Sequence, residues 1–435
     1  MKKKSVILFL SLLIVSGVQS QDDSGSALQL PEKDMQSWRN AKFGLFIHYG
    51  LYSNIGQGEW ISLYKLMDRD EYGKIKDEFT FEEYTGKHWA EVAKNAGCRY
   101  MVVTTRHHDG FCLFDTEFGD FDAVNSLAGR DLIAEYAEAA RDAGLMVGFY
   151  YSPIDWRYPG YFFPTMYRSS AEEMKVQTYT QIRELLSNYG KVDILWYDGL
   201  SDRYLAIGGL EWNDEKQWHT RERDRPYTGE FSWEPDKLNT MVRELQPEIV
   251  IKGTDFGNQE FSLIRRQYRL PWEVGTNLSY PGWGWRPSDK DAMMSLDSCI
   301  QLLVTVVCKD GNLLLNVGPM PNGQIEPAQV MRLQGIGRFL EKYGESIYDT
   351  RGGIYDETWG GTTLTDRAVY VHVLKVPSDG LIYIPPVKKK IVSAVYMSDN
   401  RKVAISQTDK NVTLKDITNR HNETDVVIKL EPASE

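Results

Sequence analysis

Cysteine is scarce in this chain, and basic residues are outnumbered by acidic ones. Among its 435 residues are only four cysteines, Cys98, Cys112, Cys299 and Cys308, none of them in a C-x-x-C pair. This composition disfavours a disulfide framework, and we expect buried free thiols instead. The chain has 61 acidic residues against 50 basic ones. A surface with this excess of negative charge repels phosphate backbones, so we expect no nucleic-acid partner.

Long apolar runs are also absent, apart from one at the N-terminus. Three lysines at positions 2–4 precede a mostly apolar stretch at 6–18, and polar residues follow from Gln21. This pattern is typical of a secretory signal peptide and is too short for a stable membrane span. We therefore expect residues 1–20 to be removed and the mature protein to be exported, to the periplasm or the cell exterior, without a membrane anchor.

From Phe43 onward, apolar strands alternate with amphipathic helices, which is typical of an α/β fold. The predicted strands are 43–48, 100–105, 145–151, 192–197, 248–252, 268–274 and 312–317, and the predicted helices are 85–96, 131–143, 171–189, 235–245, 292–308 and 327–343. Such repeated crossovers build either an open doubly wound sheet or a closed barrel. No G-x-G-x-x-G follows the first strand, which disfavours dinucleotide binding. After Gly353 the pattern changes to short strands and turns, so we predict a small all-β sandwich over residues 351–435.

Polar side chains gather where the first four predicted strands end. Three of the seven histidines fall at two successive strand ends, a distribution that satisfied core histidines would not favour. The fourth strand, VDILWYDG, ends on Asp198, which taken alone would more often be a turn residue. Catalytic groups of β/α barrels lie at the carboxyl ends of the strands. The residues at these ends or just beyond them are His48, Glu59, Trp60, His107, His108, Tyr150, Tyr151 and Asp198.

The residue types at these ends indicate a sugar ligand. Aromatic planes mixed with neutral hydrogen-bonding groups and carboxylates suit the apolar faces and hydroxyl rim of a sugar. The same three histidines with Asp198 would also be a plausible metal-ligand set, so a metallohydrolase stays open as an alternative.

Several motifs resemble glycoside hydrolase family 29, the retaining α-L-fucosidases, over roughly residues 38–354. The motifs are KFGLFIHYG at 42–50, GEW at 58–60, RHHDGF at 106–111, YSPIDW at 151–156, LWYDG at 195–199, PWE at 271–273 and NLLLNVGPMPNG at 312–323. The resemblance implies a (β/α)8-like TIM barrel, with irregular or missing helices, over residues 21–350. It also implies an exo-acting hydrolase of fucosylated oligosaccharides or glycoconjugates that needs neither a cofactor nor a metal.

The resemblance implies roles for individual residues as well. The motif aspartate, here Asp198, would be the nucleophile, and Tyr151 would lie near it. The residues implied to hold the sugar or to line its pocket are His48, Glu59, Trp60, His107, His108, Trp283 and Trp285. His107 and His108 can both face one sugar only if the strand ends before them, because successive strand side chains alternate. We expect both to contact it.

Retaining hydrolysis needs a second carboxyl group, about 5–5.5 Å from the nucleophile. Glu260 follows the fifth predicted strand on the catalytic side, and its D-F-x-x-x-E pattern resembles the acid/base segment of some family members. We predict Glu260 as the acid/base, followed by Glu273 and then Glu230. An arginine often found upstream of the acid/base has only Lys252 as an approximate stand-in.

Other functions stay open at this point. An α-L-galactosidase is a close alternative, because L-galactose adds only a hydroxyl to the methyl of L-fucose and apolar pockets reject such an addition weakly. A catalytically silent fucose-binding protein is a third class, which the presence of Asp198 disfavours. The β-sandwich is either a structural brace, which we favour, or a carbohydrate-binding module.

Overall fold

The computed structural model describes most of the chain. The described residues are 28–200, 210–213, 218–220, 229–260, 270–280, 282–288 and 292–433. The predicted signal peptide at 1–20 lies outside them. Within these residues no helix has the length and apolar character needed to cross a membrane.

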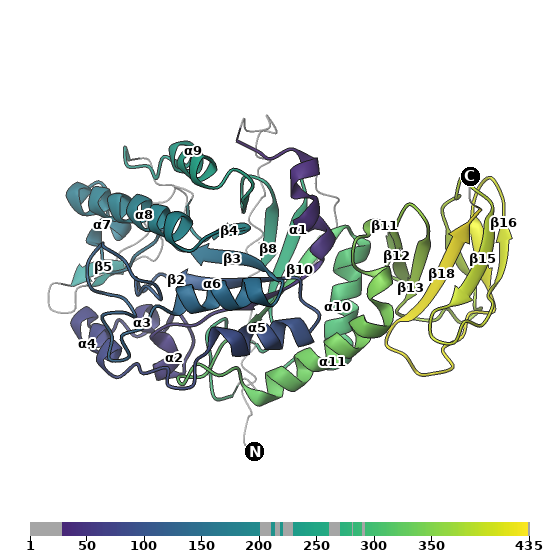
Figure 1. The fold of residues 1–435 in the computed structure, drawn as a ribbon, viewed down its shortest axis with the longest axis horizontal. Coiled ribbons are helices and arrows are strands. Elements are labelled where there is room, and N and C mark those ends of the chain that lie inside the picture. Colours follow the sequence, from purple (N-terminus) through teal and green to yellow (C-terminus); the bar gives the residue numbers. More distant parts are fainter. Residues whose placement is uncertain are drawn as a thin grey trace, which may run out of the picture.

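Eight parallel strands form the main sheet (Figure 1). They are β1 (Phe43–Ile47), β2 (Tyr100–Arg106), β3 (Met146–Tyr151), β4 (Ile194–Tyr197), β7 (Val250–Ile251), β8 (Gly257–Glu260), β9 (Trp272–Asn277) and β10 (Gly311–Val317). Their order, β7-β4-β3-β2-β1-β10-β9-β8, follows the chain around a ring. A bridge between Lys252 and Phe256 joins the two end strands. The predicted barrel fold class is confirmed.

Strand β8 is the barrel strand that the sequence pattern did not predict. Its residues, GNQE, include no apolar side chain, so neither an apolar run nor an alternating pattern marks it. Pairing with β9 holds it in place, from Gly257 opposite Trp272 to Glu260 opposite Gly275. Strand β9 accordingly begins at Trp272 rather than at residue 268. Residues 252–256 alone connect β7 to β8, so no helix separates these strands.

Six longer helices lie around the barrel strands (Figure 1). They are α5 (Gly86–Asn95), α6 (Leu132–Asp142), α8 (Arg168–Asn188), α9 (Pro235–Leu245), α10 (Leu296–Cys308) and α11 (Pro327–Tyr343). Side-chain caps begin three of them, from Thr85, Asp131 and Ser295, and satisfy backbone amides that the first helical turn leaves unpaired. Five short helices are α1 (Gln36–Ala41), α2 (Tyr52–Ile55), α3 (Ile61–Tyr64), α4 (Arg69–Gly73) and α7 (Pro159–Phe162).

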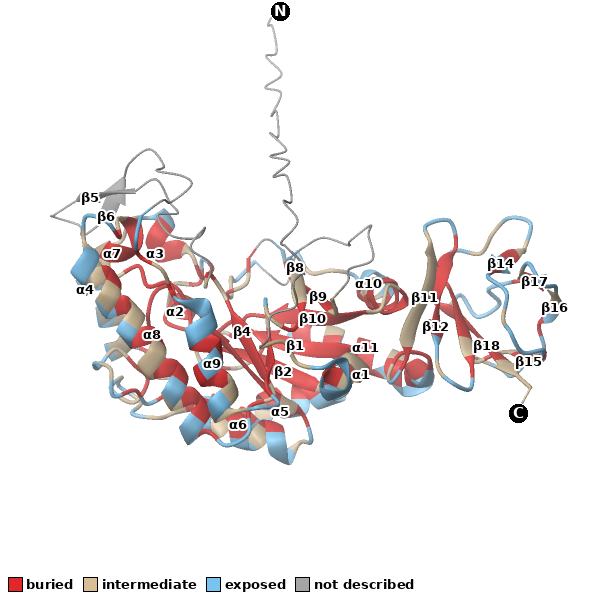
Figure 2. Cartoon of the chain, turned by 90° about the horizontal axis from the view of Figure 1, so that it is seen from above, coloured by how far each residue is buried: buried red, intermediate tan, exposed pale blue. Residues whose placement is uncertain are grey.

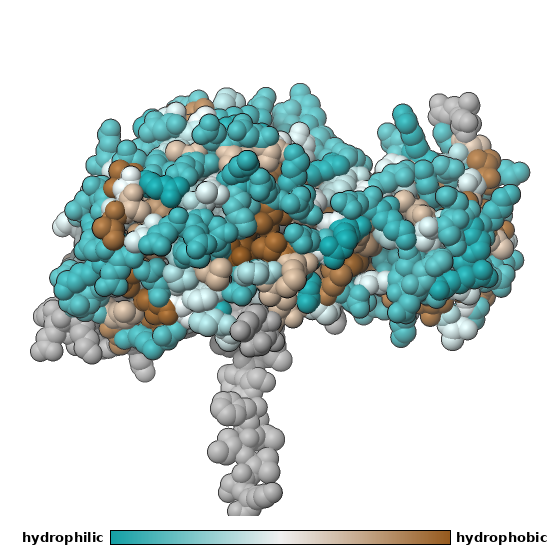
Figure 3. Space-filling model, turned by 60° about the horizontal axis from the view of Figure 1, so that its bottom comes forward, coloured by the Kyte–Doolittle hydropathy of each residue, from teal (hydrophilic) through white to brown (hydrophobic). Residues whose placement is uncertain are grey.

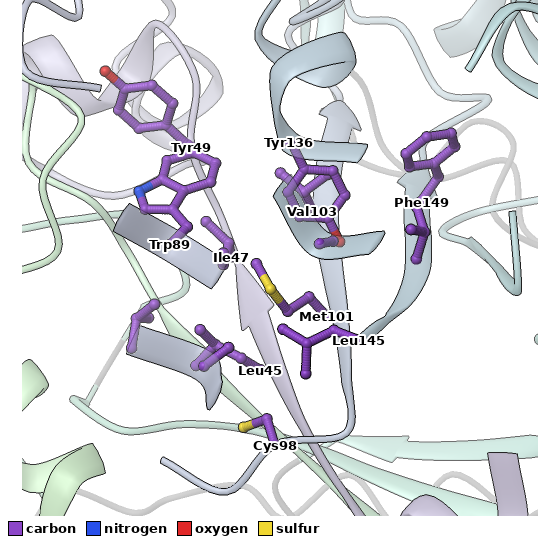
Figure 4. Close-up of a cluster of buried hydrophobic side chains, with 14 of the residues drawn as sticks. Leu45, Ile47, Tyr49, Trp89, Cys98, Met101, Val103, Tyr136, Leu145 and Phe149 are labelled. Atoms are coloured by element: carbon purple, nitrogen blue, oxygen red, sulfur yellow. The ribbon is translucent and has the colours of Figure 1, made fainter. Parts of the chain in front are cut away.

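Successive side chains of each strand point to opposite faces of the sheet, so the apolar side chains pack into two separate clusters. Leu45 and Ile47 of β1 point outward to the helices, whereas Phe46 between them points into the barrel lumen. Figure 4 shows part of the outer cluster, where Trp89 of α5 and Tyr136 of α6 meet the strands. Apart from β8, the barrel strands are buried on both faces (Figure 2), which explains their continuous apolar runs. Functional side chains must therefore emerge at the strand ends.

An antiparallel β-sandwich follows the barrel, as predicted. Its strands are β11 (Arg351–Asp356), β12 (Gly360–Leu364), β13 (Val369–Val373), β14 (Ile382–Ile384), β15 (Ile391–Tyr396), β16 (Ala404–Gln407), β17 (Val412–Lys415) and β18 (Val426–Pro432). They form a five-stranded and a three-stranded sheet around their own apolar core. Helix α10 packs against β11 and β12 (Figure 1). Elsewhere, β5 (Leu210–Asn213) and β6 (Trp218–Thr220) form a two-stranded sheet.

The outer surface is mostly polar on the face drawn in Figure 3. Hydrophilic residues cover most of it, and hydrophobic residues gather in several separate patches between them. No broad apolar surface is visible on this face.

Candidate active site

Asp198 lies directly beyond β4 at the carboxyl end of the barrel. Its Oδ2 atom accepts a hydrogen bond from the Tyr150 hydroxyl at 2.7 Å, and Nε2 of His108 lies 3.4 Å from the same oxygen. The side chain keeps 30% of its surface exposed, so a ligand can reach it. Burial opposes ionisation, but the charges of His108 and Lys252 and the Tyr150 hydrogen bond hold the pKa of Asp198 below its ordinary value. Asp198 is thus an accessible, ionised carboxylate.

His48 follows β1, and its tautomer can be assigned from its neighbours. The Asn316 amide nitrogen donates to Asn277 Oδ1 at 2.9 Å and to the Trp283 carbonyl at 2.8 Å. The Asn316 amide oxygen must therefore accept, so Nδ1 of His48, 2.7 Å away, carries the proton. Burial lowers the pKa of His48 to about 3, which makes it neutral. Its Nε2 is left as a hydrogen-bond acceptor.

His107 and His108 both lie beyond β2, which ends at Arg106. Their ring centroids are 4.2 Å apart, and the His107 ring stacks on Tyr150 at 5.8 Å. Nδ1 of His108 contacts the Ser152 hydroxyl at 2.6 Å, which orients Nε2 toward Asp198. The strand end permits both rings to face one region, which the alternation of a continuing strand would have prevented.

Glu59 and Trp60 lie in the connection after β1 and border the space next to the three histidines. Oε2 of Glu59 accepts from the backbone amides of Trp283 and Gly284, at 3.0 and 2.8 Å. The Trp60 ring meets the edge of His108 with centroids 5.3 Å apart. Trp283 packs against His48 at 5.1 Å. These contacts bring the Glu-Trp pair and Trp283 to the histidines.

The prediction for Tyr151 needs correction. Its hydroxyl donates to Gln181 of α8 at 2.8 Å and accepts from Arg106 at 3.1 Å, on the outer face of β3. Only its backbone carbonyl touches Asp198, by accepting from the Asp198 amide. Because side chains alternate along a strand, the preceding residue, Tyr150, points into the lumen and reaches the carboxylate.

Trp285, which the resemblance places in the sugar pocket, contacts other elements than Trp283 does. Its indole nitrogen donates to Glu326 at 3.4 Å, just before α11, and its ring lies against Gly56. The side chain of Trp283 approaches His48, whereas that of Trp285 faces this neighbouring loop.

The three candidate acid/base residues occupy different environments. Glu260 ends β8 at the mouth of the barrel and is exposed. The surrounding protein partly shields the Glu260 carboxyl group from water, which raises its pKa, and the negative charge of Asp198 raises it further. The positive charge of Lys252 lowers it. Glu273 is fully buried in the lumen, and Glu230 is 95% exposed beside Arg168. Among the three, Glu260 combines access to solvent with the influence of Asp198.

Sequence reasoning missed two residues that hold this site together. Asn316, the penultimate residue of β10, orients His48, and Ser152 orients His108. Asn316 interrupts the apolar run LLLNV, so the strand-end rule applied to the last strand could have found it. Ser152 follows the last residue of β3 and lies within the motif YSPIDW, so the same rule could have found it.

The chain is similar in sequence to a family of known proteins. The family model described as alpha-L-fucosidase matches residues 14–345. An alpha-L-fucosidase of Dictyostelium discoideum is 26% identical over 441 residues, covering 88% of this chain and 87% of that protein.

Two solved structures are similar as well. Alpha-L-fucosidase isoenzyme 1 from Paenibacillus thiaminolyticus is 31% identical with a TM-score of 0.77, covering 93% of this chain and 99% of its own. The Thermotoga maritima alpha-fucosidase in complex with fucose is 26% identical with a TM-score of 0.70, covering 91% and 96%.

Proposed function

The chain belongs to the alpha-L-fucosidase family, glycoside hydrolase family 29, and on that premise we propose that it releases terminal α-L-fucose from glycans by a retaining double displacement. Asp198 is the nucleophile and Glu260 the acid/base in this proposal. The observation that carries it is the contact of Tyr150 and His108 with one oxygen of Asp198, which leaves the other to react.

In the first step, Oδ1 of Asp198 attacks the anomeric carbon of fucose. The bond from that carbon to the leaving oxygen breaks as Glu260 transfers its proton to the oxygen, and a fucosyl ester on Asp198 results. Tyr150 and His108 stay on Oδ2 and keep the carboxylate oriented. The low pKa of Asp198 supports its ionised state, which this attack requires.

In the second step, Glu260 takes a proton from water, and the water oxygen attacks the same carbon and releases Asp198. Two inversions retain the anomeric configuration. Glu260 must be protonated first and ionised afterwards. A raised pKa, caused by partial removal from water and by the Asp198 charge, favours the protonated state that the first step requires.

The sugar hydroxyls are recognised by groups whose role as hydrogen-bond acceptors is set by their neighbours in the protein. Nε2 of His48 accepts from one hydroxyl, because its other nitrogen is committed to Asn316. Oε1 of Glu59 accepts from another, because two backbone amides hold Oε2. His107, Trp60 and Trp283 supply ring edges and faces around these groups.

The alternatives make different demands on the site. An α-L-galactosidase needs room for one more hydroxyl where fucose carries its methyl. A metallohydrolase needs converging ligands, and within the described residues no three His, Cys, Asp or Glu side chains are grouped to hold an ion. A silent binding protein would bind fucose without releasing a leaving group.

A panel of aryl α-L-fucosides and α-L-galactosides, assayed with the wild type and Asp198→Ala, tests the proposal. We expect the wild type to prefer fucosides and to keep its activity in a strong chelator. Asp198→Ala should lose turnover by orders of magnitude, and azide should restore it with formation of the inverted glycosyl azide. Wild-type turnover in Asp198→Ala would refute the assignment.

Export is a further part of the proposal, supported by the basic and apolar N-terminal pattern of residues 2–18. Determination of the N-terminus of the protein recovered outside the cytoplasm should place it near residue 21. A cytoplasmic protein with an intact N-terminus would contradict export.

A further inference from the structure

A carboxylate without contact to solvent lies inside the barrel lumen. Glu273, on β9, is 0% exposed. Its Oε2 accepts from the Tyr100 hydroxyl at 2.6 Å and its Oε1 from the indole nitrogen of Trp196 at 3.1 Å. Tyr100 begins β2 and Trp196 is on β4, so this side chain ties together strands that are not neighbours in the sheet. A buried carboxylate is costly unless it is hydrogen-bonded, and here both oxygens are.

Trp196 connects this carboxylate to Asp198. Its ring stacks on Tyr150 with centroids 5.5 Å apart, and Tyr150 donates to Asp198. The Lys252 ammonium lies 3.4 Å from the centroid of the same ring. Since the strand order is β3-β4-β7, Tyr150 and Lys252 flank Trp196 from opposite sides. Both are groups that lower the pKa of Asp198.

We propose that Glu273 is a positioning residue, which fixes the Trp196 ring and through it sets the places of Tyr150 and Lys252 beside Asp198. This inference rests on the proposed role of Asp198 as nucleophile. An indole nitrogen can only donate, so without an acceptor at position 273 it would be buried without a partner, and the ring would reorient.

The position of Glu273 argues against its acting as the acid/base. It is the second residue of β9, close to the amino end of the barrel, whereas Asp198 lies beyond the carboxyl end of β4. Both of its oxygens are occupied by side chains that pack the lumen. A leaving oxygen of a sugar bound at Asp198 would have to displace Trp196 to reach it.

The test compares Glu273→Gln with Glu273→Leu, measuring kcat, KM and the pH profile on an aryl fucoside. The amide of Gln keeps an oxygen for Trp196 and a polar partner for Tyr100, so we expect kcat within about threefold of wild type. Leu removes both contacts and should lower kcat by about 10- to 100-fold, as expected when reacting groups are misplaced. The acidic limb of the pH profile should also move to higher pH, because Tyr150 and Lys252 then lower the pKa of Asp198 by a smaller amount.

Trp196→Phe is a second variant, which deletes the indole donor and replaces the indole by a smaller aromatic ring. We expect it to move the acidic limb in the same direction, so the inference stays testable if Glu273→Leu does not fold. His372→Leu is the control, because His372 is a buried polar residue of β13 in the sandwich. It should reduce stability and leave the acidic limb in place.

The outcomes separate this inference from the proposed function. An inactive wild type would overturn the function. An active wild type with an unmoved acidic limb in both Glu273→Leu and Trp196→Phe would overturn the positioning role alone. If Glu273→Gln lost turnover as severely as Glu273→Leu, and azide restored it, Glu273 would be the acid/base, which also contradicts the inference.

Discussion

The hydroxyl oxygen of Tyr150 lies 2.7 Å from Oδ2 of Asp198 and donates its proton to that carboxylate. The phenol comes from β3 and the carboxylate from the end of the neighbouring strand β4, so sheet pairing holds the two groups together. A hydrogen bond to the ionised form of a carboxyl group lowers its pKa. The contact therefore both orients Asp198 and favours its ionised state.

Removal of this phenol should be visible in the pH profile. In Tyr150→Phe we expect kcat/KM to fall about tenfold, the effect of roughly 1.4 kcal/mol. The acidic limb should move to higher pH, because Asp198 loses a group that lowers its pKa. Tyr151→Phe is the matched control, since the Tyr151 hydroxyl bonds Gln181 on the outer face. An equal shift of the acidic limb in the control would contradict the assignment.

Lys252 should affect both limbs of the profile. Its charge lowers the pKa of Asp198, which must be ionised, and that of Glu260, which must be protonated. Lys252→Met should therefore move the acidic and the basic limb upward together. Lys237→Met removes a largely exposed lysine near the Tyr179 ring on α8 and should move neither. Limbs that move in opposite directions would show that the cation does not act on both carboxyl groups.

Loss of the acid/base should depend on the leaving group. Glu260→Gln should keep most of kcat/KM on aryl fucosides with low-pKa leaving groups and lose it on poor leaving groups, which need protonation. Values of kcat/KM across a series of aryl fucosides should fall steeply with leaving-group pKa. Glu230→Gln alters a carboxyl group that is 95% exposed, and its kcat/KM should follow that of the wild type. An equal loss of kcat/KM on all leaving groups would contradict the role of Glu260.

The buried Glu273 should make stability depend on pH. Burial raises the pKa of Glu273 to about 7, from 4.5, so the folded state holds this proton more tightly than the unfolded chain. The resulting stabilisation is full below pH 4.5 and is lost as pH rises to about 7. Glu273→Gln has no proton to release at this position. Its free energy of unfolding should therefore rise by up to about 3 kcal/mol relative to that of the wild type over this pH interval. Urea unfolding at several pH values measures the difference, and a constant difference would contradict it.

A buried hydrogen bond should stabilise the sandwich. Nδ1 of His372 lies 2.7 Å from Oδ2 of Asp425, and both side chains are 0% exposed. His372→Leu leaves the carboxyl group of Asp425 buried without this partner and should cost about 1–3 kcal/mol. Chemical denaturation should show the loss, while kcat at low temperature stays at the wild-type value. An unchanged unfolding midpoint would show that Asp425 finds another partner.

The contrast between β4 and β8 shows how far the sequence could predict this fold. The run VDILWYDG marks β4 and its terminal aspartate, because an apolar run bounded by a turn is a local pattern. The polar GNQE of β8 carries no such pattern, and only its pairing with β9 makes it a strand. The sequence therefore predicted the barrel but not every strand in it.

The sequence by itself determined the fold class, the family resemblance and the strand ends at which His48, His107, His108 and Asp198 emerge. These depend on apolar runs and on motif residues that are close together in the chain. The tertiary structure decided that Tyr150 rather than Tyr151 meets Asp198, that Asn316 orients His48, and that Glu273 is enclosed in the lumen. Those outcomes depend on which way each strand faces once the sheet has closed. Closure of the sheet brings together residues that are far apart in the sequence, so no local sequence pattern predicts these contacts.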